Sequence, residues 1–170
     1  MRDIIIGSVA FLLALVISSV WFIHARDARS EVLQPIQFNH KLMIEKTGFT
    51  CMGCHKLVKT NARAGIPNIE TCGMCHSQMM GKSNEENKVV AYVRQNKQIP
   101  WRTIYYVPDY VYFSHRRHVG IAKLKCSVCH GAIASMTTPP RKQFLAIKMQ
   151  NCIDCHEKYK ASTDCYACHR

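Results

Sequence analysis

The sequence predicts a mainly α-helical chain with much irregular structure, in which one N-terminal transmembrane helix precedes a compact domain. Three observations support this prediction. Residues 4–23 carry no charge, all ten cysteines fall into five identical short motifs, and roughly 140 residues follow the apolar run. If each of the five motifs binds a group, so little protein cannot build a separate apolar core around each group. The bound groups themselves must therefore form much of the core.

The N-terminal segment has the length of a membrane span. Residues 4–23 match the ~20 residues that a helix needs to cross a bilayer, and Trp21 near the end of the run suits a membrane interface. A cleaved signal peptide would have a shorter apolar region and a small-residue cleavage site, which the sequence lacks. We expect residues 1–30 to be an uncleaved anchor with its juxtamembrane segment, and residues 31–170 to be the domain.

Each cysteine motif reads Cys-x-x-Cys-His, which is the attachment signature of c-type haem. The two thiols bond covalently to the haem, and the histidine ligates the iron from the proximal side. Zinc ribbons and redox dithiols also use Cys-x-x-Cys, but neither requires the histidine. We therefore predict five haem c groups and an electron carrier. The attachment residues are Cys51 and Cys54, Cys72 and Cys75, Cys126 and Cys129, Cys152 and Cys155, and Cys165 and Cys168; the proximal ligands are His55, His76, His130, His156 and His169.

The formal net charge of +12 raises the question of an acidic partner. Five haems would bring ten propionates, which can pair with Lys and Arg through charge-assisted hydrogen bonds. Much of the positive surplus is then internal compensation. We expect no nucleic-acid role.

An internal repeat groups four of the motifs. A shift of 75 residues aligns Phe38-x-His40 with Phe113-x-His115, and the motif at Cys51 with that at Cys126. A second motif follows each copy. The domain therefore divides into a first unit at about 36–80, a linker at 81–110, a second unit at about 111–157 and a fifth haem at 158–170.

The repeat resembles the class III cytochromes c (c3 and c7), in which a Phe-x-His-x-x-His stretch supplies distal haem ligands. The resemblance implies that His40 caps the haem on Cys51/Cys54, that His115 caps the haem on Cys126/Cys129, and that His118 reaches another haem. Met43 stands where the second copy has His118, and it is either an axial ligand, which would raise the haem potential, or core filling. Met136, Met149 and His24 are the remaining candidate distal ligands. At least one iron is therefore ligated by a methionine or by His24, or it has no distal ligand.

The linker contains one expected helix. Ser83 to Glu86 fits a capping box, and an apolar stripe follows, so we predict a helix over about 84–97. Residues 99–113 are rich in aromatics and proline and cannot form regular helix. We expect an extended arm that packs on haem faces or on a partner.

The stretches at 99–118 and 164–169, together with the single span and five motifs, resemble the pentahaem subunit of alternative complex III and its relative in quinone reductase complexes. This resemblance implies a largely non-catalytic respiratory subunit that relays electrons from quinol oxidation to a periplasmic acceptor or oxidase. It also implies an iron–sulfur subunit, a monohaem cytochrome c and multi-span quinol-binding subunits as partners, and a haem domain on the periplasmic side of the cell membrane. The alternatives are a stand-alone membrane-anchored quinol dehydrogenase and a catalytic multihaem reductase.

Overall fold

The computed structural model describes residues 11–22 and 31–170, and the chain divides into two units, Met1–Val32 and Leu33–Arg170. Residues 11–22 are helical and exposed. Among the described residues, no helix is both long and apolar enough to cross a bilayer. The expected span over 4–23 reaches beyond the described residues at both ends, and His24 also lies outside them.

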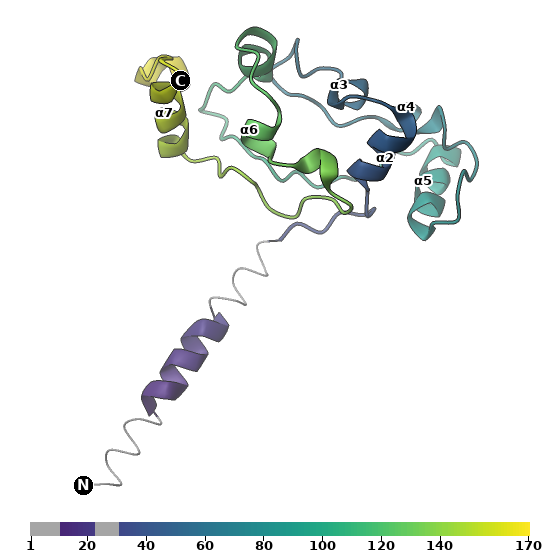
Figure 1. Cartoon of the computed structure of the whole chain (residues 1–170), viewed down its shortest axis with the longest axis horizontal. Helices are drawn as coiled ribbons and strands as arrows, with labels where there is room; N and C mark the ends of the chain where they lie inside the picture. Colours follow the sequence, from purple (N-terminus) through teal and green to yellow (C-terminus); the bar gives the residue numbers. More distant parts are fainter. Residues whose placement is uncertain (1–10, 23–30) are drawn as a thin grey trace. The chain divides into compact units, whose positions relative to one another are not determined.

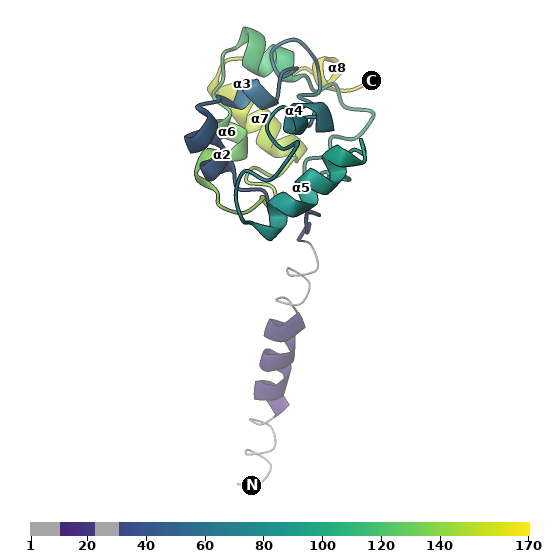
Figure 2. The same ribbon diagram turned by 90° about the vertical axis from the view of Figure 1, so that its right-hand side faces the viewer.

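The second unit is mainly helical, small and compact, and its described residues form no strand beyond one isolated bridge between Val111 and His169 (Figures 1 and 2). Its helices are short, because each serves mainly to hold one motif or one turn. They are α2 (His40–Thr47), α3 (Cys51–Cys54), α4 (Ile69–Gly73), α5 (Asn84–Arg94), the π-helix η1 (Arg116–Ile121), α6 (Ser127–His130), the 3₁₀ turn η2 (Ile133–Ser135), α7 (Met149–Lys158) and α8 (Cys165–Cys168).

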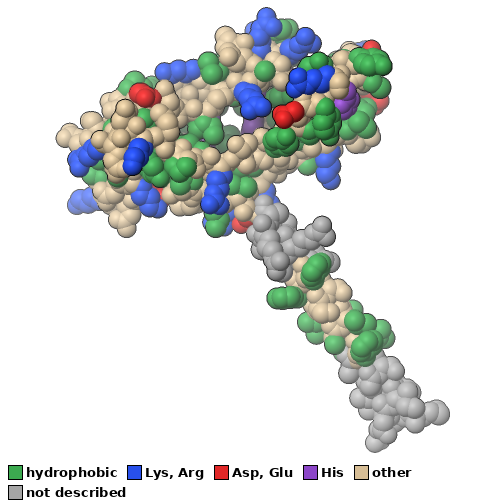
Figure 3. All heavy atoms as spheres, turned by 180° about the vertical axis from the view of Figure 1, so that it is seen from behind, with side chains coloured by type: hydrophobic (Ala, Val, Ile, Leu, Met, Phe, Trp, Pro, Cys, Tyr) green, Lys and Arg blue, Asp and Glu red, His purple; other side chains and the backbone are tan. Residues whose placement is uncertain are grey.

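The apolar core is small. Of the described hydrophobic side chains, five are buried: Ile36, Val58, Ile69, Val90 and Ile99. Many large apolar side chains are exposed to solvent, and Figure 3 shows hydrophobic side chains in green on the surface. The same view shows an opening through the domain. A chain of this length normally buries most of its apolar surface. Side-chain packing alone therefore does not account for the fold.

Helix α5 is shorter than the sequence predicts. It begins as expected after Ser83, whose hydroxyl accepts a hydrogen bond from the N–H of Glu85 at 3.2 Å. It ends at Arg94 and not at 97, because Asn96 adopts a left-handed φ of 50° that no helix accommodates. The predicted capping box is incomplete, since the carboxylate of Glu86 bonds elsewhere.

The two copies of the repeat hold their Phe-x-His pairs alike. Phe38 meets His40 edge-on with ring centroids 4.8 Å apart, and Phe113 meets His115 edge-on at 5.0 Å. The next turn differs, because the first copy continues as α-helix and the second as the π-helix η1. In η1 a Cβ at Gly120 would overlap the carbonyl oxygen of Lys59, so the wider turn brings the two copies into backbone contact.

The aromatic arm over 99–113 contains no helix, in keeping with its prolines. The hydroxyl of Tyr105 donates to the carbonyl of Cys129 at 3.1 Å and accepts from the N–H of Phe144 at 2.8 Å. Further along, the N–H of Tyr112 donates to the carbonyl of Cys168 at 2.8 Å. The arm thus ties the third motif to the fifth.

Candidate haem-binding site

Each Cys-x-x-Cys-His motif forms a single helical turn. In four of them the histidine N–H donates to the carbonyl of the first cysteine at 2.8–2.9 Å. One turn brings residues three and four apart to the same face, so both thiols and the imidazole are presented together. None of the ten cysteines forms a disulfide, so every thiol of the five motifs is available for attachment. Within the described residues, no three His, Cys, Asp or Glu side chains gather around a metal position.

Two of the candidate distal histidines face proximal ones. The rings of His115 and His130 are nearly parallel, with centroids 6.4 Å apart and an interplanar angle of 9°. The rings of His118 and His156 lie 6.1 Å apart at 42°. Two imidazoles on opposite sides of a metal ion, each with its nitrogen about 2.0–2.1 Å away, have centroids a little over 6 Å apart. Both pairs therefore fit the two axial positions of one haem iron.

The orientation of these rings is set by their Nδ1 atoms. A ligating histidine normally donates its second ring N–H to a carbonyl or carboxylate, which leaves the other nitrogen for the metal. The Nδ1 atoms of His115 and His118 lie 3.0 and 2.8 Å from the carbonyl oxygens of Ala62 and Ser114. Two proximal rings do the same: His55 to Gly65 at 2.9 Å, and His156 to Ser162 at 2.6 Å.

His40 lies near the first motif. Burial lowers the pKa of His40, and the neighbouring His55 lowers it further. The Nδ1 atom of His40 is buried without a hydrogen-bond partner. A half-buried, neutral imidazole close to a proximal histidine fits the role of a distal ligand, because only the neutral ring can donate electrons to iron.

The methionine candidates are less closely tied to the motifs. The carbonyl of Met136 accepts from the N–H of Lys41 at 3.0 Å, so η2 lies against the start of α2, next to His40. Met43 is half-buried on α2. Met149 is 64% exposed at the start of α7.

Neighbouring motifs lie close enough for their thiols to interact electrostatically. Burial raises the pKa of the Cys72 thiol, and the nearby Cys54 thiol raises it further. Burial also raises the pKa of Cys126, followed by the charge of Cys51 and a hydrogen bond with it. The first motif therefore lies between the second and the third.

The thiols of the third, fourth and fifth motifs also lie close to one another. Burial raises the pKa of Cys129, with further increases from Cys155 and Cys152. Burial likewise raises the pKa of Cys152, and Cys168 adds to it. By these neighbour relations the motifs form a row in the order second, first, third, fourth, fifth, and Figure 1 shows α4, α3, α6 and α7 in the same order across the domain.

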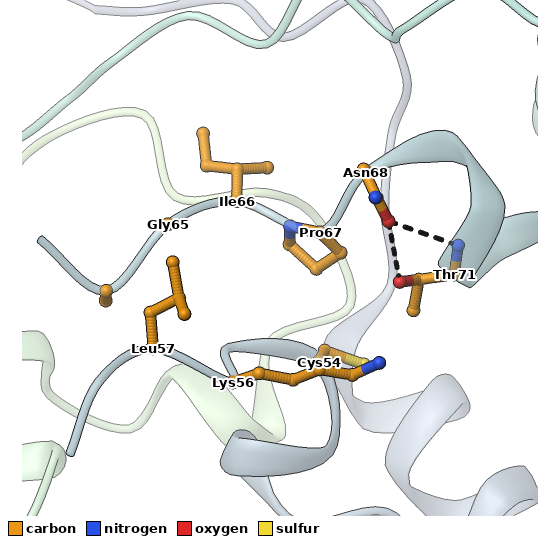
Figure 4. A pocket seen from close by; sticks show the side chains of 9 residues that line it. Cys54, Lys56, Leu57, Gly65, Ile66, Pro67, Asn68 and Thr71 are labelled. Carbon is orange, nitrogen blue, oxygen red and sulfur yellow. Dashed lines mark hydrogen bonds between the residues drawn. The ribbon is translucent and has the colours of Figure 1, made fainter. Parts of the chain in front are cut away.

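A cavity of about 230 Å³ is lined by Cys54 of the first motif and by residues of the segment 56–71 that leads to the second motif. The side chains of Leu57, Ile66 and Pro67 line it beside the Cys54 thiol (Figure 4). The side chain of Asn68 holds Thr71 there through bonds of 3.4 Å to its N–H and 2.9 Å to its hydroxyl. The cavity gives the first attachment site an apolar wall, which suits the face of a haem.

Sequence reasoning missed two residues at the site. The carboxylate of Glu86 lies 3.1 Å from Nδ1 of His76, although its position in the first turn of a helix predicts only a capping role. The ring of Tyr110 lies 6.1 Å from that of His169 at an angle of 19°. The aromatic arm suggested packing on haem faces, but the sequence does not single out Tyr110.

Two comparisons with known proteins agree with this geometry. Residues 111–170 match the family described as cytochrome c7 and related cytochrome c. Over 96% of its length, the chain is 31% identical to the multihaem cytochrome c subunit of menaquinone reductase from Nitratidesulfovibrio vulgaris, and the match covers 90% of that protein. The chain therefore belongs to the same family of multihaem, electron-transferring c-type cytochromes as this subunit.

Proposed function

We propose that this chain is the five-haem, membrane-anchored electron-transfer subunit of a quinone-linked oxidoreductase complex of the alternative complex III type. It relays electrons between the membrane quinone pool and a periplasmic acceptor or oxidase. Residues 4–23 form its single span, and the haem domain lies on the periplasmic side. The observation that carries the proposal is the continuous row of five motifs, in which two motif histidines already face distal partners.

The chain's residues would hold the haems close enough for electrons to pass between them. A c-type haem, when bound, takes up and releases one electron. The thiols of successive motifs are near enough to perturb one another's pKa values, so the groups attached to them would be neighbours. His115 and His130 would ligate the third iron, His118 and His156 the fourth, and His40 and His55 the first.

The remaining two distal positions would be filled differently. Met43, Met136, Met149 and His24 are the candidate donors, and Tyr110 lies against the fifth motif. A thioether donor raises the potential of a haem relative to a second imidazole. The irons would therefore differ in potential, which a relay needs in order to have a direction.

The relative named a menaquinone reductase subunit supports a quinone-linked complex. By resemblance, the partners would be an iron–sulfur subunit, a monohaem cytochrome c and multi-span quinol-binding subunits. Affinity purification of the chain from native membranes tests this. We expect those subunits to co-purify and menaquinol to reduce the haems. A chain that purifies alone and still oxidises quinol would be the stand-alone dehydrogenase instead.

Haem content and anchoring are tested on the same material. We expect a covalent haem stain on a denaturing gel, five haems per chain by alkaline pyridine spectra, and retention in membranes after carbonate washing. Proteolysis of spheroplasts should remove the haem domain. Fewer than five haems, or release by carbonate, would contradict the proposal.

A further inference from the structure

The proximal histidine of the second motif has a partner of a different kind from the others. His76 directs Nδ1 at a carboxylate oxygen of Glu86, 3.1 Å away, whereas the Nδ1 partners of His55, His115, His118 and His156 are neutral backbone carbonyls. The side chains of His76 and Glu86 are only 19% and 11% exposed. The contact is therefore largely shielded from solvent, where a charge acts more strongly than in water.

The carboxylate is held in place by the backbone. Glu86 stands in the first turn of α5, and the N–H groups of Met80 and Gly81 donate to its two oxygens at 2.7 and 2.9 Å. A Cβ added at Gly81 would come within 3.0 Å of the nearer oxygen, so the loop closes tightly around the acid. Two backbone N–H donors on one carboxyl group favour its ionised form. The group that meets His76 is therefore an anion.

We propose that Glu86 is a positioning residue that lowers the reduction potential of the haem attached at Cys72 and Cys75. This inference rests on the proposed function, because it presupposes a haem at that motif. If Nε2 of His76 held the iron, its Nδ1–H would donate a hydrogen bond to the Glu86 carboxylate. A carboxylate partner makes the imidazole a more basic ligand. The more basic ligand and the nearby negative charge both favour Fe(III) over Fe(II).

The position of the second motif in the row decides how a lower haem potential there affects electron transfer. In the order set out above, the second motif is at one end of the row, beside the first motif. A lower reduction potential at the end haem favours electron transfer from that haem to its neighbour in the row. Glu86 would therefore drive electrons inward from this end.

Glu86→Gln tests the charge with little change of shape, and Glu85→Gln is the matched control. Glu85 is the adjacent acid in the same helical turn, and it pairs with Lys88 and the N–H of Gln37 instead of a motif histidine. Both variants are made in the full chain, within its native complex, and titrated potentiometrically with EPR and optical detection of each haem.

In Glu86→Gln we expect one haem to move to higher potential, with about a tenfold change in its Fe(III)/Fe(II) equilibrium, or about 59 mV for one electron. The other haems and the Glu85→Gln control should titrate as in the unmodified chain. Unchanged midpoints, a downward shift or an equal shift in the control would overturn the proposal. If Glu86→Gln fails to assemble, Glu86→Asp withdraws the charge from His76 by one methylene and should give a smaller upward shift. Midpoints unchanged in Glu86→Asp would overturn it equally.

The two proposals fail in different ways. An unmodified chain that carries no haem at the second motif contradicts the proposed function. A fully loaded chain that is indifferent to Glu86→Gln contradicts only the role of Glu86.

Discussion

Replacement of His115 and His118 by alanine, singly and together, tests whether the two histidines serve different irons. They are three residues apart and both touch Phe113. Their rings nevertheless face different motifs, because His115 meets His130 at 6.4 Å and His118 meets His156 at 6.1 Å. Each substitution should therefore remove the distal ligand of one haem and leave the other haem unaffected.

The expected magnitude follows from the number of motifs. One of five motifs is affected in each single variant, so one fifth of the haem should change from low-spin to high-spin. In the double variant two fifths should change, since each substitution removes the distal ligand of a different iron. If both histidines served one iron, the double variant would match a single one.

Quantitative EPR of the oxidised protein measures the low-spin fraction, and carbon monoxide binding to the reduced protein counts the opened sites. Added imidazole should restore the low-spin signal, which separates loss of a ligand from general misfolding. Arg116→Ala is the control, because this exposed residue lies between the two histidines. A single variant that stays fully low-spin, or a double variant no different from its parents, would refute the axial pairing.

Three further predictions follow from the fold. Gly120→Ala should lower the free energy of unfolding by about 1–3 kcal/mol, measured by urea denaturation, because its Cβ would overlap the carbonyl oxygen of Lys59; an unchanged midpoint would contradict this contact. Phe113→Leu should alter the EPR g-values of two haems at once, since its ring touches both distal histidines of the second repeat. The pKa of Glu85 is lowered chiefly by its hydrogen bond from Lys88, so its stabilising effect is present above the usual carboxyl pKa of 4.5 and is lost as the pH falls through the lower folded value. Glu85→Gln should therefore be less stable than the unmodified chain at neutral pH but not at strongly acidic pH, and a gap that persists in acid would argue against this.

Much of the candidate site could be predicted from the sequence, because it depends on residues that are close together in the chain. A Cys-x-x-Cys-His motif places thiols and imidazole on one helical turn whatever surrounds it, so attachment sites and proximal ligands could be predicted from spacing. The mainly helical fold and the non-helical arm were also predictable, because proline excludes helix from the arm. The end of α5 was predicted one turn too late, since the sequence does not show that Asn96 turns left-handed.

Relations between distant residues depended on the tertiary structure. The sequence order of the motifs does not give their order in space, where the first lies between the second and the third. Nor does spacing show that the second copy of the repeat winds as a π-helix, that His118 meets His156, or that Glu86 leaves its capping position for His76. A Cys-x-x-Cys-His motif consists of five consecutive residues, and the sequence alone therefore predicts haem attachment there. Which groups surround each haem depends on backbone approach between segments far apart in the chain, and only the folded domain decides that.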